Sequence, residues 1–247
     1  MPEDLITVIA IGLLTGGLVG TIGVGGILLS PLLALVAGVD LQQAMAVASA
    51  SFLATGIAGT AAYARKRSID WRMLCWLSLG LAPAAIAGAR VNQVAGTTWL
   101  SLVLAMLIAG AGVHALLPGT RRSTLEHVTL APPSLILIGG AVGFGSALTG
   151  TGGPVLLLPI LMPLGVPVLA AIGVSQVVQL PIAVAATLTH GLVGELDVQL
   201  AVWLGVIQVV GVVVGAALAH RLPAERLRKL VAWSLLAVAI VLAVRYF

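Results

Sequence analysis

The sequence predicts an all-α polytopic membrane protein built from two inverted-topology repeats of about 120 residues each. First, 60% of its 247 residues are hydrophobic, only 8% are charged, and its mean hydropathy is +1.17. About a quarter of the residues of a soluble domain are charged, so this chain has too few charged residues to cover the surface of a soluble protein. Second, apolar runs of about 20 residues, the length that crosses the hydrocarbon core, recur along the whole chain. Third, the second half of the sequence repeats the first.

Each half contains five apolar elements, separated by turn signals such as Gly38-Val39-Asp40, Pro118-Gly119, Pro132-Pro133 and Pro223. We predict helices over residues 5–22, 27–37, 42–63, 71–89 and 97–117, and then over 132–149, 154–164, 168–190, 198–219 and 224–244. The acidic start lacks a small-residue cleavage site, so we expect the first run to be a retained span. The second element of each half, at roughly 16 Å of helix, is too short to cross. We therefore expect each repeat to be a broken or re-entrant helical hairpin followed by three transmembrane helices, although ten full crossings also satisfy the topology.

The two halves are related by a shift of 127 residues that needs no gap. Glycine pairs, aspartates and tryptophans recur at this shift, and such matches are rare by chance in so apolar a sequence: Gly25-Gly26 with Gly152-Gly153, Asp70 with Asp197, and Trp76 with Trp203. We therefore divide the chain into a first membrane repeat at 1–117, a cytoplasmic linker at 118–131 and a second membrane repeat at 132–247.

The basic residues predict the orientation, because cytoplasmic loops carry an excess of Lys and Arg. Ten of the twelve lie in three loops that we assign to the inside: Arg65, Lys66, Arg67 and Arg72; Arg121 and Arg122; Arg221, Arg226, Arg228 and Lys229. Both termini are then outside, and the two repeats run antiparallel across the membrane.

The candidate site lies at two glycine-rich breaks, Gly20–Gly26 and its counterpart Ala147–Gly153. A bilayer tolerates such a break only where protein or a polar cavity meets its backbone. Pro154 follows the second break directly, as suits the first position of a helix. Two helix N-termini meeting in mid-membrane would bind an anion through main-chain N–H groups, without a buried cation. The predicted substrate-binding residues here are Thr21, Gly23, Gly25, Gly26, Thr149, Gly150, Thr151, Gly152 and Gly153.

Four further polar residues follow the breaks on the next helices: Ser49, Ser175, Gln176 and Gln179. They could line a substrate cavity or hydrogen-bond a neighbouring helix, and the sequence leaves both readings open. Glycines four apart, Gly12 with Gly16 and Gly211 with Gly215, are typical of close helix packing. Asp70 and Asp197 each precede an apolar run and are predicted N-caps.

The sequence lacks the residue patterns that other classes of function would require. An intramembrane enzyme would need a nucleophile–base pair or metal ligands in mid-span, and no His-Glu-x-x-His motif is present. No Lys-Ser/Thr pair follows the glycines, so they do not form a nucleotide-binding P-loop. The single cysteine excludes a disulfide framework and a cysteine cluster. We predict no catalytic residue, cofactor, metal or nucleic-acid partner; the expected partners are a small anion and the bilayer, with a homodimer left open. A transporter is the leading reading, and an anion channel is the alternative.

The paired Gly-x-Gly-Gly breaks, the duplicated layout, the small size and the Ala-rich element after each break resemble the sulfite exporter TauE/SafE family. The resemblance covers essentially the whole chain and maps onto Gly23, Gly25, Gly26, Gly150, Gly152 and Gly153. It implies a permease of the bacterial inner membrane that moves sulfite, sulfoacetate-like organosulfonates or related anions, usually outward; import of the same class is the alternative. The breaks differ at Gly20 against Ala147 and at Pro31 against Leu158, so their shapes need not match.

Overall fold

The computed structural model describes residues 5–92, 109, 113, 130–149, 153–193 and 196–246, and within these residues it contains nine α-helices and no strand. The helices are α1 (Leu5–Ile22), α2 (Gly26–Leu35), α3 (Leu41–Arg65), α4 (Trp71–Asn92), α6 (Pro132–Thr149), α7 (Pro154–Leu161), α8 (Val168–Val193), α9 (Val198–Arg221) and α10 (Ala224–Tyr246). Four of them, α3, α4, α8 and α9, contain segments long and apolar enough to cross a membrane. The all-helical, multi-span class predicted from the sequence is therefore confirmed for the described residues.

The helices follow the predicted order, and their ends agree with the prediction to within three residues. The element predicted at 97–117 lies outside the described residues except for Ala109 and Val113, which are helical. Helices α2 and α7 have only 10 and 8 residues. At about 1.5 Å per residue, neither helix could cross a bilayer.

Two helix starts confirm the predicted aspartate caps. The Asp70 Oδ1 atom accepts a hydrogen bond of 2.9 Å from the Met73 N–H at the start of α4. The Asp197 Oδ1 atom accepts one of the same length from the Leu200 N–H at the start of α9. Each carboxylate satisfies one of the N–H groups that a helix leaves without an internal partner. The two caps occupy the same place in the two halves.

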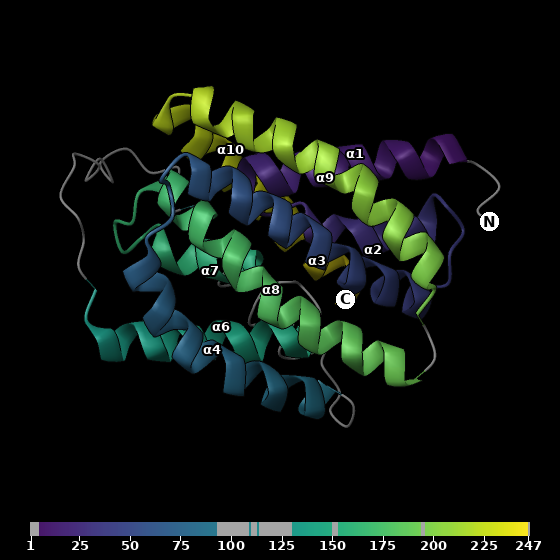
Figure 1. Ribbon diagram of the computed structural model, residues 1–247, viewed down its shortest axis with the longest axis horizontal. Coiled ribbons are helices and arrows are strands. Elements are labelled where there is room, and N and C mark those ends of the chain that lie inside the picture. Colours follow the sequence, from purple (N-terminus) through teal and green to yellow (C-terminus); the bar gives the residue numbers. More distant parts are fainter. Residues whose placement is uncertain are drawn as a thin grey trace.

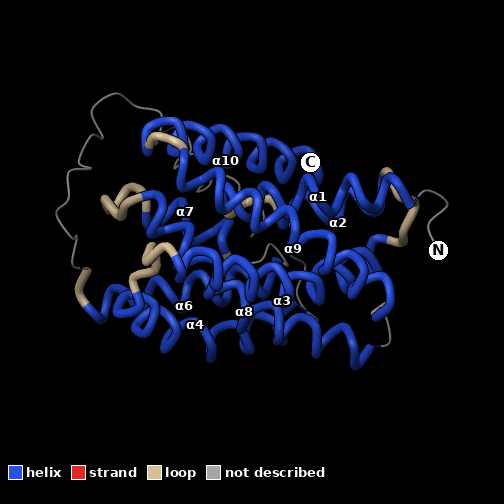
Figure 2. The backbone as a smooth tube through the Cα atoms, turned by 45° about the horizontal axis from the view of Figure 1, so that its top comes forward, coloured by secondary structure: helices blue, strands red, loops and turns tan. Residues whose placement is uncertain are grey.

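The helices lie roughly along one long axis and form three layers (Figures 1 and 2). Helices α4 and α6 pair at one edge, α1 packs against α9 near α10 at the other, and α3 and α8 cross between them. The helix contacts are preserved when the 127-residue shift exchanges the two halves: α1 with α9 corresponds to α6 with α4, and α2 with α3 corresponds to α7 with α8. The α3–α8 contact corresponds to itself.

Glycines bring the paired helices into backbone contact. A Cβ atom added at Gly16 would lie 2.8 Å from the Cα atom of Gln208 on α9, and one at Gly143 would lie 3.0 Å from the Cα atom of Leu81 on α4. These two contacts are equivalent under the shift. At Gly211 and Gly215 an added Cβ would likewise meet the backbone of α1, whereas at Gly12 it would meet the side chains of Ile207 and Leu204 on α9. The packing interpretation of these glycines is therefore confirmed.

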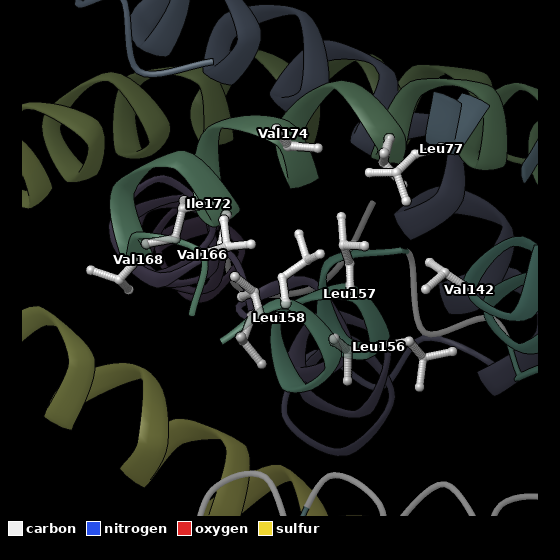
Figure 3. Close-up of a cluster of buried hydrophobic side chains, with 14 of the residues drawn as sticks. Leu77, Val142, Leu156, Leu157, Leu158, Val166, Val168, Ile172 and Val174 are labelled. Carbon is white, nitrogen blue, oxygen red and sulfur yellow. The ribbon is translucent and has the colours of Figure 1, made fainter. Parts of the chain in front are cut away.

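The short helix α7 is almost fully enclosed, although it does not span the molecule. Seven of its eight residues are buried. Figure 3 shows its leucines facing side chains from three neighbours, among them Leu77 of α4, Val142 of α6 and Ile172 of α8. This packing holds the start of α7 inside the protein.

Candidate functional site

The first break separates α1 from α2. Helix α1 ends at Ile22, and Gly23 then adopts φ +77°, a left-handed conformation that residues with a Cβ rarely adopt. Its N–H still donates to the Val19 carbonyl at 3.0 Å. Gly25, the residue before α2, lies against the backbone of α1, where an added Cβ atom would be 2.7 Å from the Leu18 Cβ. The chain therefore turns back tightly on the end of its own helix.

The second break differs from the first at Gly153. Helix α6 ends at Thr149, and Gly153 adopts φ +44° directly before Pro154, the first residue of α7. The prediction that proline opens this helix is confirmed. In the first break the counterpart of Gly153 is Gly26, which is already helical, so these two equivalent glycines differ in backbone conformation. The side chain of Thr149, and Gly150, Thr151 and Gly152, lie outside what the structure describes.

The two breaks lie next to each other. A Cβ atom added at Gly23 would be 3.7 Å from the Pro154 Cβ, 3.0 Å from the Leu158 Cδ1 and 3.3 Å from the Ser175 Oγ. Gly23 precedes α2 by three residues, and Pro154 begins α7. The start of the second short helix therefore contacts the turn that leads into the first.

Both breaks also flank the crossing of α3 and α8. An added Cβ atom at Gly26 would lie 2.9 Å from the ring of Phe52, and one at Gly153 would lie 3.7 Å from the Cα of Gln179. Phe52 and Gln179 are equivalent under the shift, lie near the middle of α3 and α8, and are joined directly: the Gln179 Nε2 donates to the Phe52 carbonyl at 3.0 Å. The breaks therefore meet where the two halves of the chain cross.

The predicted polar residues are turned toward helices in this conformation. Gln179 also donates to the Thr55 Oγ1 at 2.7 Å, and the Gln176 Nε2 donates to the Val19 carbonyl of α1 at 2.8 Å. The hydroxyls of Thr21, Ser49 and Ser175 donate to carbonyls of their own helices. Of the two readings that the sequence left open, hydrogen bonding to a neighbouring helix describes both glutamines here. Ser175 nevertheless lies at the meeting point of the breaks.

Sequence reasoning missed four residues of this region: Phe52, Thr55, Gly59 and Tyr63. Phe52 could have been found as the counterpart of Gln179 under the shift, whereas Thr55 corresponds to Ile182, which is not a candidate residue. Tyr63 corresponds to His190 under the shift, but its place two residues from the end of a long helix does not indicate burial; it is fully buried, and its hydroxyl donates to the Gly20 carbonyl at 2.8 Å. The role of Gly59 follows only from the structure, in which the Gln176 side chain occupies the space that a Cβ atom at residue 59 would fill.

The electrostatics of the region come from neutral groups. Among the described residues, every buried polar side chain is a hydroxyl or an amide, and none is charged. Helix N-termini, by contrast, present N–H groups without internal partners and about half a positive charge each. Helices α2 and α7 both begin at the breaks, so the local field favours a negative group.

Residues 8–242, nearly the whole chain, match the family described as sulfite exporter TauE/SafE. No curated protein and no solved structure matches the chain. Because the match spans far more than half of the sequence and agrees with the apolar helical fold, the chain belongs to the sulfite exporter TauE/SafE family of membrane transporters.

Proposed function

We propose that this protein is a secondary transporter that exports a small oxyanion, such as sulfite, sulfoacetate or a related organosulfonate, across the bacterial inner membrane. Transport proceeds by alternating access around a midplane site between the two glycine breaks. The observation that carries the proposal is the approach of Gly23 to Pro154 and Ser175. Family membership supports the transporter class and the anionic substrate.

The anion is held by main-chain N–H groups at the starts of α2 and α7. Oxyanions bind well at helix N-termini because the free N–H groups and the helix dipole act together. In α7, Pro154 has no N–H and the Leu156 and Leu157 N–H groups donate to the Gly153 carbonyl, so the Val155 N–H is the donor that the first turn offers the anion. The hydroxyls of Thr21 and Ser175 add donors when they rotate away from their own helices, and Gly153, Thr149 and the residues between them complete the site.

The two halves form an inverted repeat. Support comes from the equivalent helix ends, the equivalent aspartate caps and the backbone contacts of Gly16 and Gly143, which recur at the 127-residue shift. With the basic loops in the cytoplasm, both termini lie outside. An inside-negative potential then drives an anion outward with about 2.3 kcal/mol per charge per 100 mV, which suits export.

An anion channel and an importer of the same class are the alternatives, and flux measurements separate them. The purified protein is reconstituted into vesicles loaded with sulfite, and efflux is followed over a range of sulfite concentrations and imposed potentials. Sulfate, thiosulfate, sulfoacetate and taurine serve as competitors. A carrier saturates and exchanges labelled for unlabelled anion, whereas a channel does neither. Absence of flux with all five compounds would overturn the proposal.

A matched pair of glycine variants tests the site. Gly23 and Gly38 both have positive φ, +77° and +65°, so alanine strains the backbone similarly at each. An alanine Cβ at Gly38 would meet nothing within 4 Å, whereas one at Gly23 would project toward Pro154 and Ser175. We expect Gly23→Ala to lose most of the flux and Gly38→Ala to retain it at equal expression. Equal flux from the two variants would remove Gly23 from the site.

A further inference from the structure

The last turn of α1 is held by side chains from two distant helices. The Val19 carbonyl accepts both the Gly23 N–H at 3.0 Å and the Gln176 Nε2 of α8 at 2.8 Å. The Gly20 carbonyl accepts the hydroxyl of Tyr63, from α3, at 2.8 Å. A helix leaves its last four carbonyls without internal partners, and inside a membrane water does not replace them. The Val19 carbonyl thus gains a second donor from Gln176, and the Gly20 carbonyl, at the start of the break, receives its donor from Tyr63.

Both donors are fully buried, and the burial of Gln176 leaves its side-chain oxygen without a hydrogen-bond partner in the described part of the chain. Tyr63 and Gln176 each have 0% of their surface exposed. The Gln176 Oε1 is buried without a hydrogen-bond partner in the described part of the chain, although its Nε2 is well bonded. Gly59 provides the space for the Gln176 amide, because a Cβ atom at residue 59 would collide with that side chain. A residue kept only for packing would not need a buried amide with an unsatisfied oxygen.

The equivalent place in the second repeat is built differently. The counterpart of Gln176 is Ser49, whose hydroxyl donates to the Met45 carbonyl of its own helix at 2.8 Å. It therefore does not reach across to α6 as Gln176 reaches across to α1. The counterpart of Tyr63 is His190, whose side chain lies outside the described residues. The amide contact is therefore a property of the first break and not of the repeat.

We infer that Tyr63 and Gln176 are positioning residues that clamp the end of α1 and so fix the direction in which the first break presents its free N–H groups. This inference rests on the proposed function for its effect on anion binding, whereas the clamp itself is a property of the fold. With the clamp intact, the turn at Gly23 and the start of α2 keep one orientation toward α7. Without the Tyr63 hydroxyl the Gly20 carbonyl loses that donor, and without the Gln176 amide the Val19 carbonyl keeps only the Gly23 N–H, so in each case the last turn of α1 is held less firmly and the break reorients.

Transport kinetics test the effect on binding. Tyr63→Phe removes a single oxygen atom, and Tyr246→Phe makes the same change at the chain's other tyrosine. Gln176→Leu removes the buried amide; Gln208→Leu is its control, because Gln208 also makes a buried interhelical hydrogen bond, to Thr15. We expect Tyr63→Phe and Gln176→Leu to raise the KM for sulfite about fivefold, the factor that one hydrogen bond is worth, with little change in maximal rate. Neither control changes KM.

Thiol labelling tests the clamp without any substrate. Val24 lies in the first break and is only 2% exposed. In a background with Cys75→Ser, Val24→Cys should react slowly with a membrane-permeant maleimide, and adding Tyr63→Phe or Gln176→Leu should raise the rate about fivefold. Unchanged labelling in both variants overturns the clamp even if sulfite is transported. Raised labelling together with no flux of any anion in the parent protein leaves the clamp standing and overturns the proposed function instead.

Discussion

Alanine at Gly16 or Gly143 is expected to destabilise the protein by forcing two helices apart. The atom facing each glycine is backbone, so no side chain can rotate away. The added Cβ would sit 2.8 Å from the Gln208 Cα or 3.0 Å from the Leu81 Cα, about 1 Å inside the usual carbon–carbon separation. Overpacking of this kind costs about 1–3 kcal/mol. At about 2 kcal/mol the melting temperature should fall by roughly 4–8 °C for a chain of this size.

Neighbouring glycines provide the controls. An added Cβ at Gly17 would have its nearest contact at 4.0 Å, and one at Gly140 at 3.9 Å. All four glycines are helical, so the gain in helix propensity from alanine is common to them and cancels in the comparison. Melting is followed by heating detergent-solubilised protein and measuring the folded fraction by fluorescence-detected size exclusion. If Gly16→Ala and Gly17→Ala melt at the same temperature, the close approach of α1 and α9 is wrong.

The remaining predictions concern the helix caps and the topology. Asp70→Ala and Asp197→Ala should each lower the free energy of unfolding by about 1 kcal/mol, or the melting temperature by roughly 2–4 °C. Asparagine at either position should restore most of this stability, because it also caps helices. An alanine variant that melts like the parent protein would contradict the cap. Single cysteines at Arg67, Arg122 and Arg228, in a chain whose native cysteine is replaced by serine, should all be protected from an impermeant thiol reagent added outside intact cells. Labelling of one or two of the three would refute the orientation.

The helices could be predicted because the residues that start and stop them act locally. Asp70 and Asp197 cap helices through bonds to residues three positions away, and Pro154 fits the first position of a helix. Several helices run past their predicted ends, as α3 does to Arg65. Polar residues at the end of a span are good helix formers, so the loss of hydropathy there does not mark the end of the helix.

The breaks could be located from the sequence, but the surroundings of their side chains could not. Gln176 meets Val19 across 157 positions of the chain, and Tyr63 meets Gly20 across 43. Whether a glutamine faces a cavity or a carbonyl depends on which helix lies opposite, and hydropathy does not encode that. The burial of Tyr63 was likewise beyond prediction, because tyrosine near the end of a span ordinarily lies at the membrane surface.

The bond between Gln179 and Phe52 has a consequence for how such a chain can evolve. The two positions correspond, so in an assembly of two identical half-length subunits the same residue would have to face itself there. A glutamine in one half that bonds the main chain at a phenylalanine in the other requires two half sequences that have diverged, and a single chain that carries both halves allows this. Splitting the chain into two copies of either half would therefore change the chemistry at the centre of the molecule first, while leaving most peripheral contacts available.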